Sequence, residues 1–173
     1  KVSALTYSWF MEARTLHAPL NALSAATRPP GIEIATLTTF DIPALAVLTL
    51  EAYGDDVTPE ALLETSEELR LTFEGAFGAT TEDSFVGAWD GGTLVGAILV
   101  VRESPWDDAP DGPFVVDLIV APDYRRRGIA TALVAEVAGR CASWGFGSLA
   151  LRLDSRHGGA NELYSVLGFE EIA

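Results

Sequence analysis

An apolar run that leads through three consecutive arginines into a helical pattern constrains this fold more than any other stretch of the chain. Residues 114–120 predict a buried strand, residues 128–143 predict a helix, and Arg125, Arg126, Arg127 and Gly128 lie at the junction. The first turn of a helix offers unpaired N–H groups and the positive end of the helix dipole, and glycine lets a ligand approach the backbone. We therefore predict that this junction binds an anion such as a pyrophosphate.

The composition favours one folded domain and argues against several classes of protein. With 173 residues, of which 49% are hydrophobic and 9% aromatic, the chain can bury a substantial core. The formal net charge of -14 argues against general nucleic-acid binding, which depends on neutralisation of phosphates by Lys and Arg. The single cysteine, Cys141, rules out an intrachain disulfide. One Cys and two His cannot build a Cys/His metal array, so we expect no metal.

The sequence gives no sign of a membrane or secretory segment. No apolar run approaches the roughly 18 residues of a membrane span, and the first residues lack a charged-then-apolar leader. We therefore expect a soluble, cytoplasmic protein with no membrane partner.

Capping and turn signals divide most of the chain into alternating elements. The expected strands are residues 32–37, 85–89, 93–101, 114–120, 148–153 and 169–172. The expected helices are one that carries Pro43 in its first turn and ends before Gly54, one from Thr58 through Phe77, residues 128–143 and residues 160–167. The order β-α-α-β-β-β-α-β-α-β predicts a three-layer α/β or α+β fold with a mixed sheet.

Residues 1–30 differ from the remainder, which we treat as the main domain, residues 31–173. Their apolar positions fit a helical stripe and also a strand, so periodicity leaves both open. Arg28-Pro29-Pro30-Gly31 marks a break, because proline restricts itself and the residue before it. We assign residues 1–30 to an N-terminal extension that adds either a strand or a helix.

Two motifs give the chain a specific resemblance. Arg125-Arg126-Arg127-Gly128-Ile129-Ala130 has the form Gln/Arg-x-x-Gly-x-Gly/Ala, Val120-Ala-Pro122-Asp-Tyr124 leads into it, and Leu163-Tyr164-Ser165-Val166-Leu167-Gly168-Phe169 follows after a helix and a strand. Over residues 31–173 the chain resembles the GNAT superfamily of acyl-CoA-dependent N-acetyltransferases. The resemblance implies a mixed central sheet, mostly antiparallel, with helices on both faces. It also implies acetyl-CoA as cosubstrate and no metal.

The resemblance assigns the first motif to coenzyme A. Backbone N–H groups from Arg126 to Ala130, including those of Gly128 and Ile129, would converge on the pyrophosphate. Guanidinium groups of residues 125–127 would add charge-assisted hydrogen bonds. The alternative for a bare arginine run is a helix start with a solvated basic patch.

The strand before this loop splays from its neighbour in the family, and the pantetheine arm inserts there. Leu118, Ile119 and Val120 are therefore the expected backbone partners of the arm. One main-chain N–H would polarise the thioester carbonyl, in the manner of an oxyanion hole. A simple core strand is the alternative, and both can hold, since side chains pack while the backbone binds.

Two side chains are candidates for the chemistry. By resemblance Tyr164 donates a proton to the leaving thiolate, a role that a phenol of pKa near 10 can fill. Asp117, the one acid inside the buried strand, is our candidate for the base that takes a proton from the amine. The alternatives are a tyrosine packed beside Leu163 and Leu167, and an aspartate hydrogen-bonded to a neighbouring group.

The chain departs from the family at two places. His157 occupies the position where relatives commonly carry a cofactor-contacting Asn, so it either contacts the cofactor or lies in a surface loop. The family normally adds another strand beyond the one that follows the Gly-Phe pair, but this sequence stops at Ala173. Because unpaired strand edges tend to be covered, we predict that residues 4–13 fill that place, from this chain or from a partner subunit.

The sequence therefore predicts transfer of an acetyl group to a primary amine by direct attack, with the acceptor unidentified. Acidic residues of the 103–111 loop, together with Asp55 and Asp56, would form an acidic rim that favours a cationic acceptor, although a solvated loop explains them nearly as well. A non-catalytic acyl-CoA-binding or sensor module is the main rival, and an interaction domain is the second. A homodimer is compatible with the resemblance.

Overall fold

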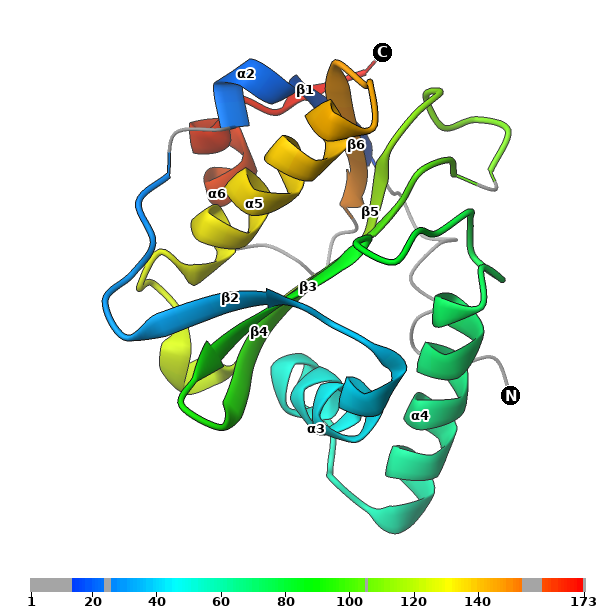
Figure 1. The fold of residues 1–173 in the computed structure, drawn as a ribbon, viewed down its shortest axis with the longest axis vertical. Coiled ribbons are helices and arrows are strands. Elements are labelled where there is room, and N and C mark those ends of the chain that lie inside the picture. Colours follow the sequence, from blue (N-terminus) through cyan, green and yellow to red (C-terminus); the bar gives the residue numbers. More distant parts are fainter. Residues whose placement is uncertain (1–13, 24–25, 105, 154–159, 173) are drawn as a thin grey trace.

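The computed structural model of this chain describes residues 14–23, 26–104, 106–153 and 160–172 (Figure 1). The strands are β1 (Arg14–Pro19), β2 (Ile32–Thr36), β3 (Phe85–Asp90), β4 (Thr93–Val101), β5 (Phe114–Val120), β6 (Ser148–Leu153) and β7 (Glu170–Glu171). The helices are α2 (Leu20–Leu23), α3 (Ile42–Tyr53), α4 (Pro59–Phe73), α5 (Ile129–Ser143) and α6 (Ala160–Leu167), with short 3-10 helices η1 (Thr39–Asp41) and η2 (Pro122–Tyr124).

The strands form one sheet in the order β2-β3-β4-β5-β6-β1-β7. All neighbouring pairs are antiparallel except β5 and β6, which are parallel. The predicted mixed, mostly antiparallel sheet with flanking helices is therefore confirmed.

Local signals place most helix ends. The Thr58 hydroxyl caps α4 by accepting a hydrogen bond from the Ala61 N–H at 3.1 Å, and α3 ends where Gly54 adopts a φ of 74°. The prediction that the second helix extends to Phe77 is wrong. α4 ends at Phe73, and the chain then turns through Gly75, whose φ of 91° is incompatible with a right-handed helix.

The N-terminal segment contributes both a strand and a short helix. β1 pairs with β6 along its whole length and with β7 through Leu16 and His17, so it lies between those two strands. β1 thus occupies the place next to the last strand that we expected the residues before Arg14 to fill. Residues 4–13 themselves lie outside the described residues. The strand at this position is supplied within the chain, so residues 14–23 belong to the same sheet and core as the domain that follows.

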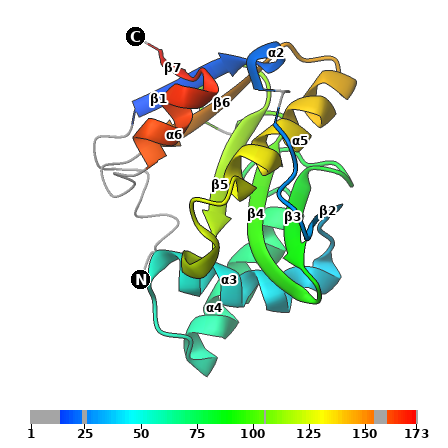
Figure 2. The same ribbon diagram turned by 90° about the vertical axis from the view of Figure 1, so that its left-hand side faces the viewer.

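Helices cover the two faces of the sheet and create two cores (Figures 1 and 2). On one face α5, α6 and α2 pack against the strands around Leu133, Ile98 and Leu149, each fully buried. On the other face α3 and α4 pack around Leu45, Leu48 and Ile119. β5 contributes side chains to both cores, so its position is fixed from both sides.

Candidate functional site

The loop between β5 and α5 has an irregular backbone that exposes several N–H groups. Arg126 has a φ of 61°, a left-handed conformation that is unusual for a residue with a side chain, and Gly128 follows with a φ of 83° as the N-cap of α5. The first backbone bond of the helix runs from the Ala132 N–H to the Gly128 carbonyl. Among the described residues, no group accepts a bond from the N–H groups of residues 126–131. Such a run of N–H groups at a helix start is suited to an anion.

Strain at Arg126 indicates that tertiary contacts hold the loop in this shape. A left-handed residue with a Cβ costs roughly 1–2 kcal/mol. Gly128 has no side chain with which to cap α5, so the N–H groups of the first turn stay available to a ligand.

The three arginines have different surroundings. Arg125 donates through Nε to the Val120 carbonyl at 3.1 Å and through Nη2 to the Ala52 carbonyl at 2.7 Å, so it joins the loop to the C-terminal end of α3. The guanidinium of Arg127 lies 4.9 Å from the centre of the Tyr124 ring. The side chain of Arg126 is exposed. Arg125 is therefore first of all a structural clamp, whereas Arg126 and Arg127 present charge at the surface of the loop.

Tyr124 connects the loop to the β3–β4 hairpin. Its hydroxyl donates to Oδ2 of Asp90 at 2.6 Å, and this hydrogen bond raises the pKa of the Tyr124 phenol. Because the phenol stays protonated, its donor contact with Asp90 is retained at neutral pH. Arg127 stacks on the same ring, which at an exposed site contributes about 0.5–1 kcal/mol. The loop is thus held at both the hairpin and α3.

Gly96 lets α5 approach the sheet, a feature that our sequence analysis missed. A Cβ built on Gly96 would lie 2.9 Å from Cγ2 of Ile129 and 3.2 Å from Cδ1 of Leu133. Ile129 is the first residue of α5, so the glycine sets the depth at which the helix start sits on β4. An isolated glycine inside a strand pattern is a known sign of close approach and could have identified it.

β5 and β6 separate beside this loop. Their parallel pairing consists of Phe114 with Ala150 and Val115 with Leu151, and no further pair joins them within the described strands. A bulge in the β4–β5 ladder leaves Val116 without a partner on β4, just before Asp117. Bulges increase local twist, which contributes to turning β5 away from β6. The predicted splay of this strand is present.

The register of β5 determines which backbone groups face the gap. The Ala121 N–H donates to the Val95 carbonyl of β4 at 2.8 Å, and alternate residues of a strand direct their N–H and C=O to the same neighbour. Ile119 therefore directs its polar backbone groups to β4, whereas Leu118 and Val120 direct theirs to the gap. The Val120 carbonyl accepts the Arg125 bond, so Leu118 and the Val120 N–H are the better candidates among the three predicted partners.

Tyr164 lies on α6 with a side chain that is 6% exposed, and its ring packs edge-on against Phe169 at 5.4 Å. Burial raises the pKa of the Tyr164 phenol, and the nearby charge of Asp117 raises it further. The two predicted catalytic side chains thus lie within electrostatic reach of each other, although they come from α6 and β5. Tyr164 remains a protonated donor throughout the neutral range.

Asp117 is 9% exposed and has a hydrogen-bond partner that the sequence analysis did not anticipate. The hydroxyl of Tyr53, the last residue of α3, donates to its Oδ1 at 2.6 Å. Tyr53 is 40% exposed, so the pair connects the buried strand with the surface. No local pattern marks Tyr53, because its partner lies on a strand far along the chain.

The residues of the predicted acidic rim come from separate segments of the chain, and the rim stays a prediction. Glu103 pairs with Ala79, beyond the C-terminal end of α4, whereas Asp55 and Asp56 precede its N-terminal end. A helix of 15 residues separates these ends by about 22 Å. Asp108 forms an ion pair with Arg152, which holds the pKa of that carboxyl below its usual range. His157 lies outside the described residues.

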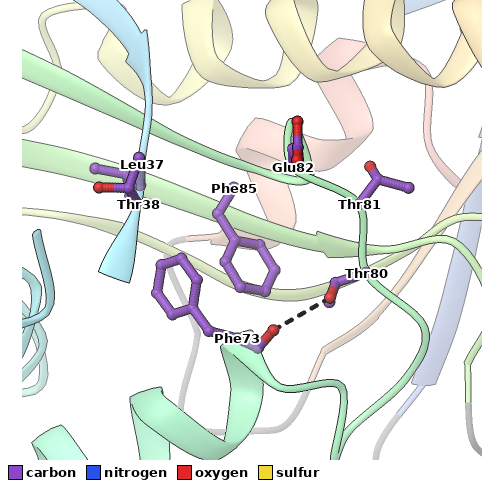
Figure 3. A pocket seen from close by; sticks show the side chains of 7 residues that line it. All are labelled: Leu37, Thr38, Phe73, Thr80, Thr81, Glu82 and Phe85. Carbon is purple, nitrogen blue, oxygen red and sulfur yellow. Dashed lines mark hydrogen bonds between the residues drawn. The ribbon is translucent and has the colours of Figure 1, made fainter. Parts of the chain in front are cut away.

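A cavity of about 700 Å³ lies elsewhere, beside the C-terminal end of α4, and none of the predicted site residues lines it (Figure 3). Phe73 and Phe85 are among its apolar lining residues, and the Thr80 hydroxyl donates to the Phe73 carbonyl at 3.3 Å. Phe85, Leu99 and Asp117 are paired in register across β3, β4 and β5, so two strand spacings, about 10 Å, separate Phe85 in the cavity lining from Asp117.

The described residues contain no grouping of three or more His, Cys, Asp or Glu side chains arranged to hold a metal ion. None of the described helices has the length and hydrophobicity that crossing a bilayer requires.

Solved structures with the same fold include several acetyltransferases. A GCN5-related N-acetyltransferase from Sphaerobacter thermophilus is 24% identical with a TM-score of 0.65, and the match covers 92% of this chain and 48% of that protein. This chain thus spans about half of its length. An aminoglycoside 6'-N-acetyltransferase from Acinetobacter baumannii is 20% identical with a TM-score of 0.63, covering 83% of this chain and 93% of that one.

A third structure shows a ligand. An N-acetyltransferase from Thermoplasma acidophilum, in complex with coenzyme A, is 19% identical with a TM-score of 0.60, covering 80% of this chain and 89% of that one. At such identities the similarity establishes the fold alone. A search among curated proteins found no significant match. The family model for the acetyltransferase (GNAT) family matches residues 48–169. These include β5, α6 and the loop between β5 and α5 that carries Arg125, Arg126 and Arg127, which we call the arginine loop. This match covers well over half of the sequence, and the chain belongs to the GNAT acetyltransferase family.

Proposed function

We propose that this protein transfers an acetyl group from acetyl-CoA to a primary amine by direct attack of the amine on the thioester. The observation that carries the proposal is the gap between β5 and β6, which opens beside the arginine loop, on the strand whose Asp117 is near enough to raise the pKa of Tyr164. A gap of this kind offers strand-like backbone partners to an extended ligand, while the helix start accepts its phosphates.

The cofactor roles follow from the contacts described above. N–H groups from Arg126 to Ala130 would bind the pyrophosphate, and the guanidinium groups of Arg126 and Arg127 would add charge. Leu118 and the Val120 N–H would bind the pantetheine arm and polarise the thioester carbonyl. Arg125 supports the loop through its carbonyl contacts.

The chemistry needs two proton transfers. The amine nitrogen forms a bond to the thioester carbon while its proton passes to the Asp117 carboxylate, directly or through a water. The carbon–sulfur bond then breaks, the amide is released, and the thiolate takes a proton from the Tyr164 phenol. Burial raises the pKa of this phenol, but a thiolate that forms in the same apolar surroundings is also destabilised and therefore becomes a better proton acceptor.

Thiol release from acetyl-CoA, followed with a panel of amines that includes polyamines and aminoglycosides, tests the proposal. Amine-dependent release, with the acetylated amine identified by mass spectrometry, would support it. Tight coenzyme A binding by calorimetry without turnover on any amine would favour a non-catalytic acyl-CoA-binding module. Absence of binding at millimolar acetyl-CoA would refute both.

Tyr164→Phe tests the role of the phenol. We expect kcat to fall by about 100–10,000-fold, because general acid catalysis contributes on that order, while the affinity for coenzyme A stays within about threefold. Equal losses of binding and thermal stability would instead mark Tyr164 as a core residue packed on Phe169.

A further inference from the structure

We propose that Tyr53 is a positioning residue whose hydroxyl fixes the Asp117 carboxylate for proton transfer from the incoming amine. The inference rests on the proposed function and adds to it a residue from a different part of the fold. The O–O distance of 2.6 Å between Tyr53 and Oδ1 of Asp117 lies within the range for charge-assisted hydroxyl–carboxylate hydrogen bonds. Such a contact orients the plane of the carboxylate.

The end of α3 is held in place, so the Tyr53 hydroxyl is held as well. The Gly54 N–H donates to the Glu51 carbonyl, and the Asp55 N–H donates to the Leu50 carbonyl, which closes the last turn of the helix. Arg125 donates to the Ala52 carbonyl, one residue before Tyr53. The same arginine is part of the loop proposed to bind the phosphates, so the two ends of the site share one support.

The exposure of Tyr53 and Asp117 indicates the side from which an amine could reach the carboxylate. Asp117 is 9% exposed and Tyr53 is 40% exposed, so the hydrogen bond joins a buried carboxylate to a residue that solvent reaches. Asp117 belongs to the face of the sheet that α3 and α4 cover, as its neighbour in register Leu99 and its alternate residue Ile119 do. Tyr164 belongs to the core on the other face. The amine would therefore approach Asp117 past Tyr53, from the face opposite Tyr164.

Loss of the Tyr53 hydroxyl should lower the rate of the chemical step more than it lowers the affinity for acetyl-CoA. Without Tyr53 the carboxylate samples more orientations, and the fraction that faces the amine falls. A hydrogen bond to a charged group corresponds to about a ten- to hundredfold change in an equilibrium constant, and we expect a rate change of that order because this bond orients the carboxylate that takes the proton. The arginine loop keeps its own contacts in the variant, so the KM for acetyl-CoA should change less than about threefold.

The test compares the wild-type chain with Tyr53→Phe, Asp117→Asn and the double variant, using the best amine from the panel. Thr49→Val is the matched control, because it removes another hydroxyl from α3, one that donates to the Leu45 carbonyl and not to Asp117. We expect a ten- to hundredfold loss of kcat in Tyr53→Phe and none in Thr49→Val. In the Asp117→Asn background, Tyr53→Phe should cause no further loss, because the two residues act as a unit.

Each outcome decides between the claims. If the wild-type chain acetylates amines and Tyr53→Phe is equally active, or if the Tyr53→Phe loss persists unchanged in the Asp117→Asn background, this inference is wrong and the proposed function stands. A rise in the KM of Tyr53→Phe for acetyl-CoA as large as its loss of kcat would also overturn the inference, since that would indicate damage to the acetyl-CoA site. If the wild-type chain turns over no amine, the proposed function fails and this inference fails with it. Thermal melts of all four variants show whether a loss of activity reflects unfolding.

Discussion

The close contact between Gly96 and the start of α5 makes Gly96→Ala the sharpest test of how this site is built. The added methyl group would lie 2.9 Å from Cγ2 of Ile129, a branched side chain that cannot move aside by changing only its outer rotamer. It would also lie 3.2 Å from Cδ1 of Leu133. We expect α5 to shift away from β4 at its first turn, where the N–H groups of the arginine loop are located.

The expected change in the free energy of unfolding for Gly96→Ala follows from two opposing effects. Overpacking in a well-packed core costs typically about 1–3 kcal/mol. Replacing glycine by alanine also reduces the entropy of the unfolded chain, which favours folding by about 0.4–1 kcal/mol. The expected net loss for Gly96→Ala is therefore about 1–2 kcal/mol, or a fall in Tm of roughly 2–8 °C for a chain of this size.

Gly139→Ala on the same helix is the matched control. Its added methyl group would meet no atom within 4 Å, and its position inside α5 favours alanine. We expect Gly139→Ala to stabilise the protein by about 0.5–1 kcal/mol. Urea unfolding measures both variants, and calorimetry measures coenzyme A binding, which should weaken only in Gly96→Ala. If Gly96→Ala matched the wild type in stability, the reasoning about the depth of α5 would be refuted.

Two other predictions concern the loop and the cysteine. Arg125→Ala should lower the free energy of unfolding by about 1–2 kcal/mol even without ligand, because two backbone carbonyls lose a charged hydrogen-bond donor. Unchanged urea unfolding would show that these two hydrogen bonds contribute nothing to stability. Cys141 is buried, and burial raises the pKa of its thiol to about 12. The neutral thiol therefore persists below that pH. The stability that the buried thiol contributes is lost only as the pH rises from about 9 toward 12. We expect no reaction of the native protein with a thiol reagent at pH 8 and one equivalent in denaturant, which would also make thiol-release assays free of background; a fast native reaction would contradict its burial.

Sequence reasoning found the elements whose signals are local. The hairpin at Asp90-Gly91-Gly92, the Thr58 cap and the strand-to-helix junction at Gly128 each depend on neighbours within a few residues, and all three are present. The splay of β5 is also present, and it was expected from the family resemblance.

Features that depend on distant partners could not be read from the sequence. The contacts of Tyr53 with Asp117 and of Arg125 with Ala52 join residues that only the fold brings together. The N-terminal segment shows the same limit, because Leu16 and Leu20 fit one helical stripe although a strand ends between them at Pro19. Pairing with β6 decides in favour of the strand, since tertiary contacts override weak local preference.

The repeated arginines of the loop are not interchangeable, and this explains why the motif alone says little about each residue. Arg125 needs a planar fork to reach two carbonyls from one side chain, a geometry that a lysine ammonium does not reproduce. Arg126 occupies a left-handed position where its backbone, rather than its side chain, shapes the row of N–H groups. Arg127 lies over the Tyr124 ring, where a flat guanidinium stacks better than an ammonium. Residues 126 and 127 are therefore the stronger candidates for direct contact with phosphate, whereas the guanidinium of Arg125 holds the end of α3, which carries Tyr53, against the loop.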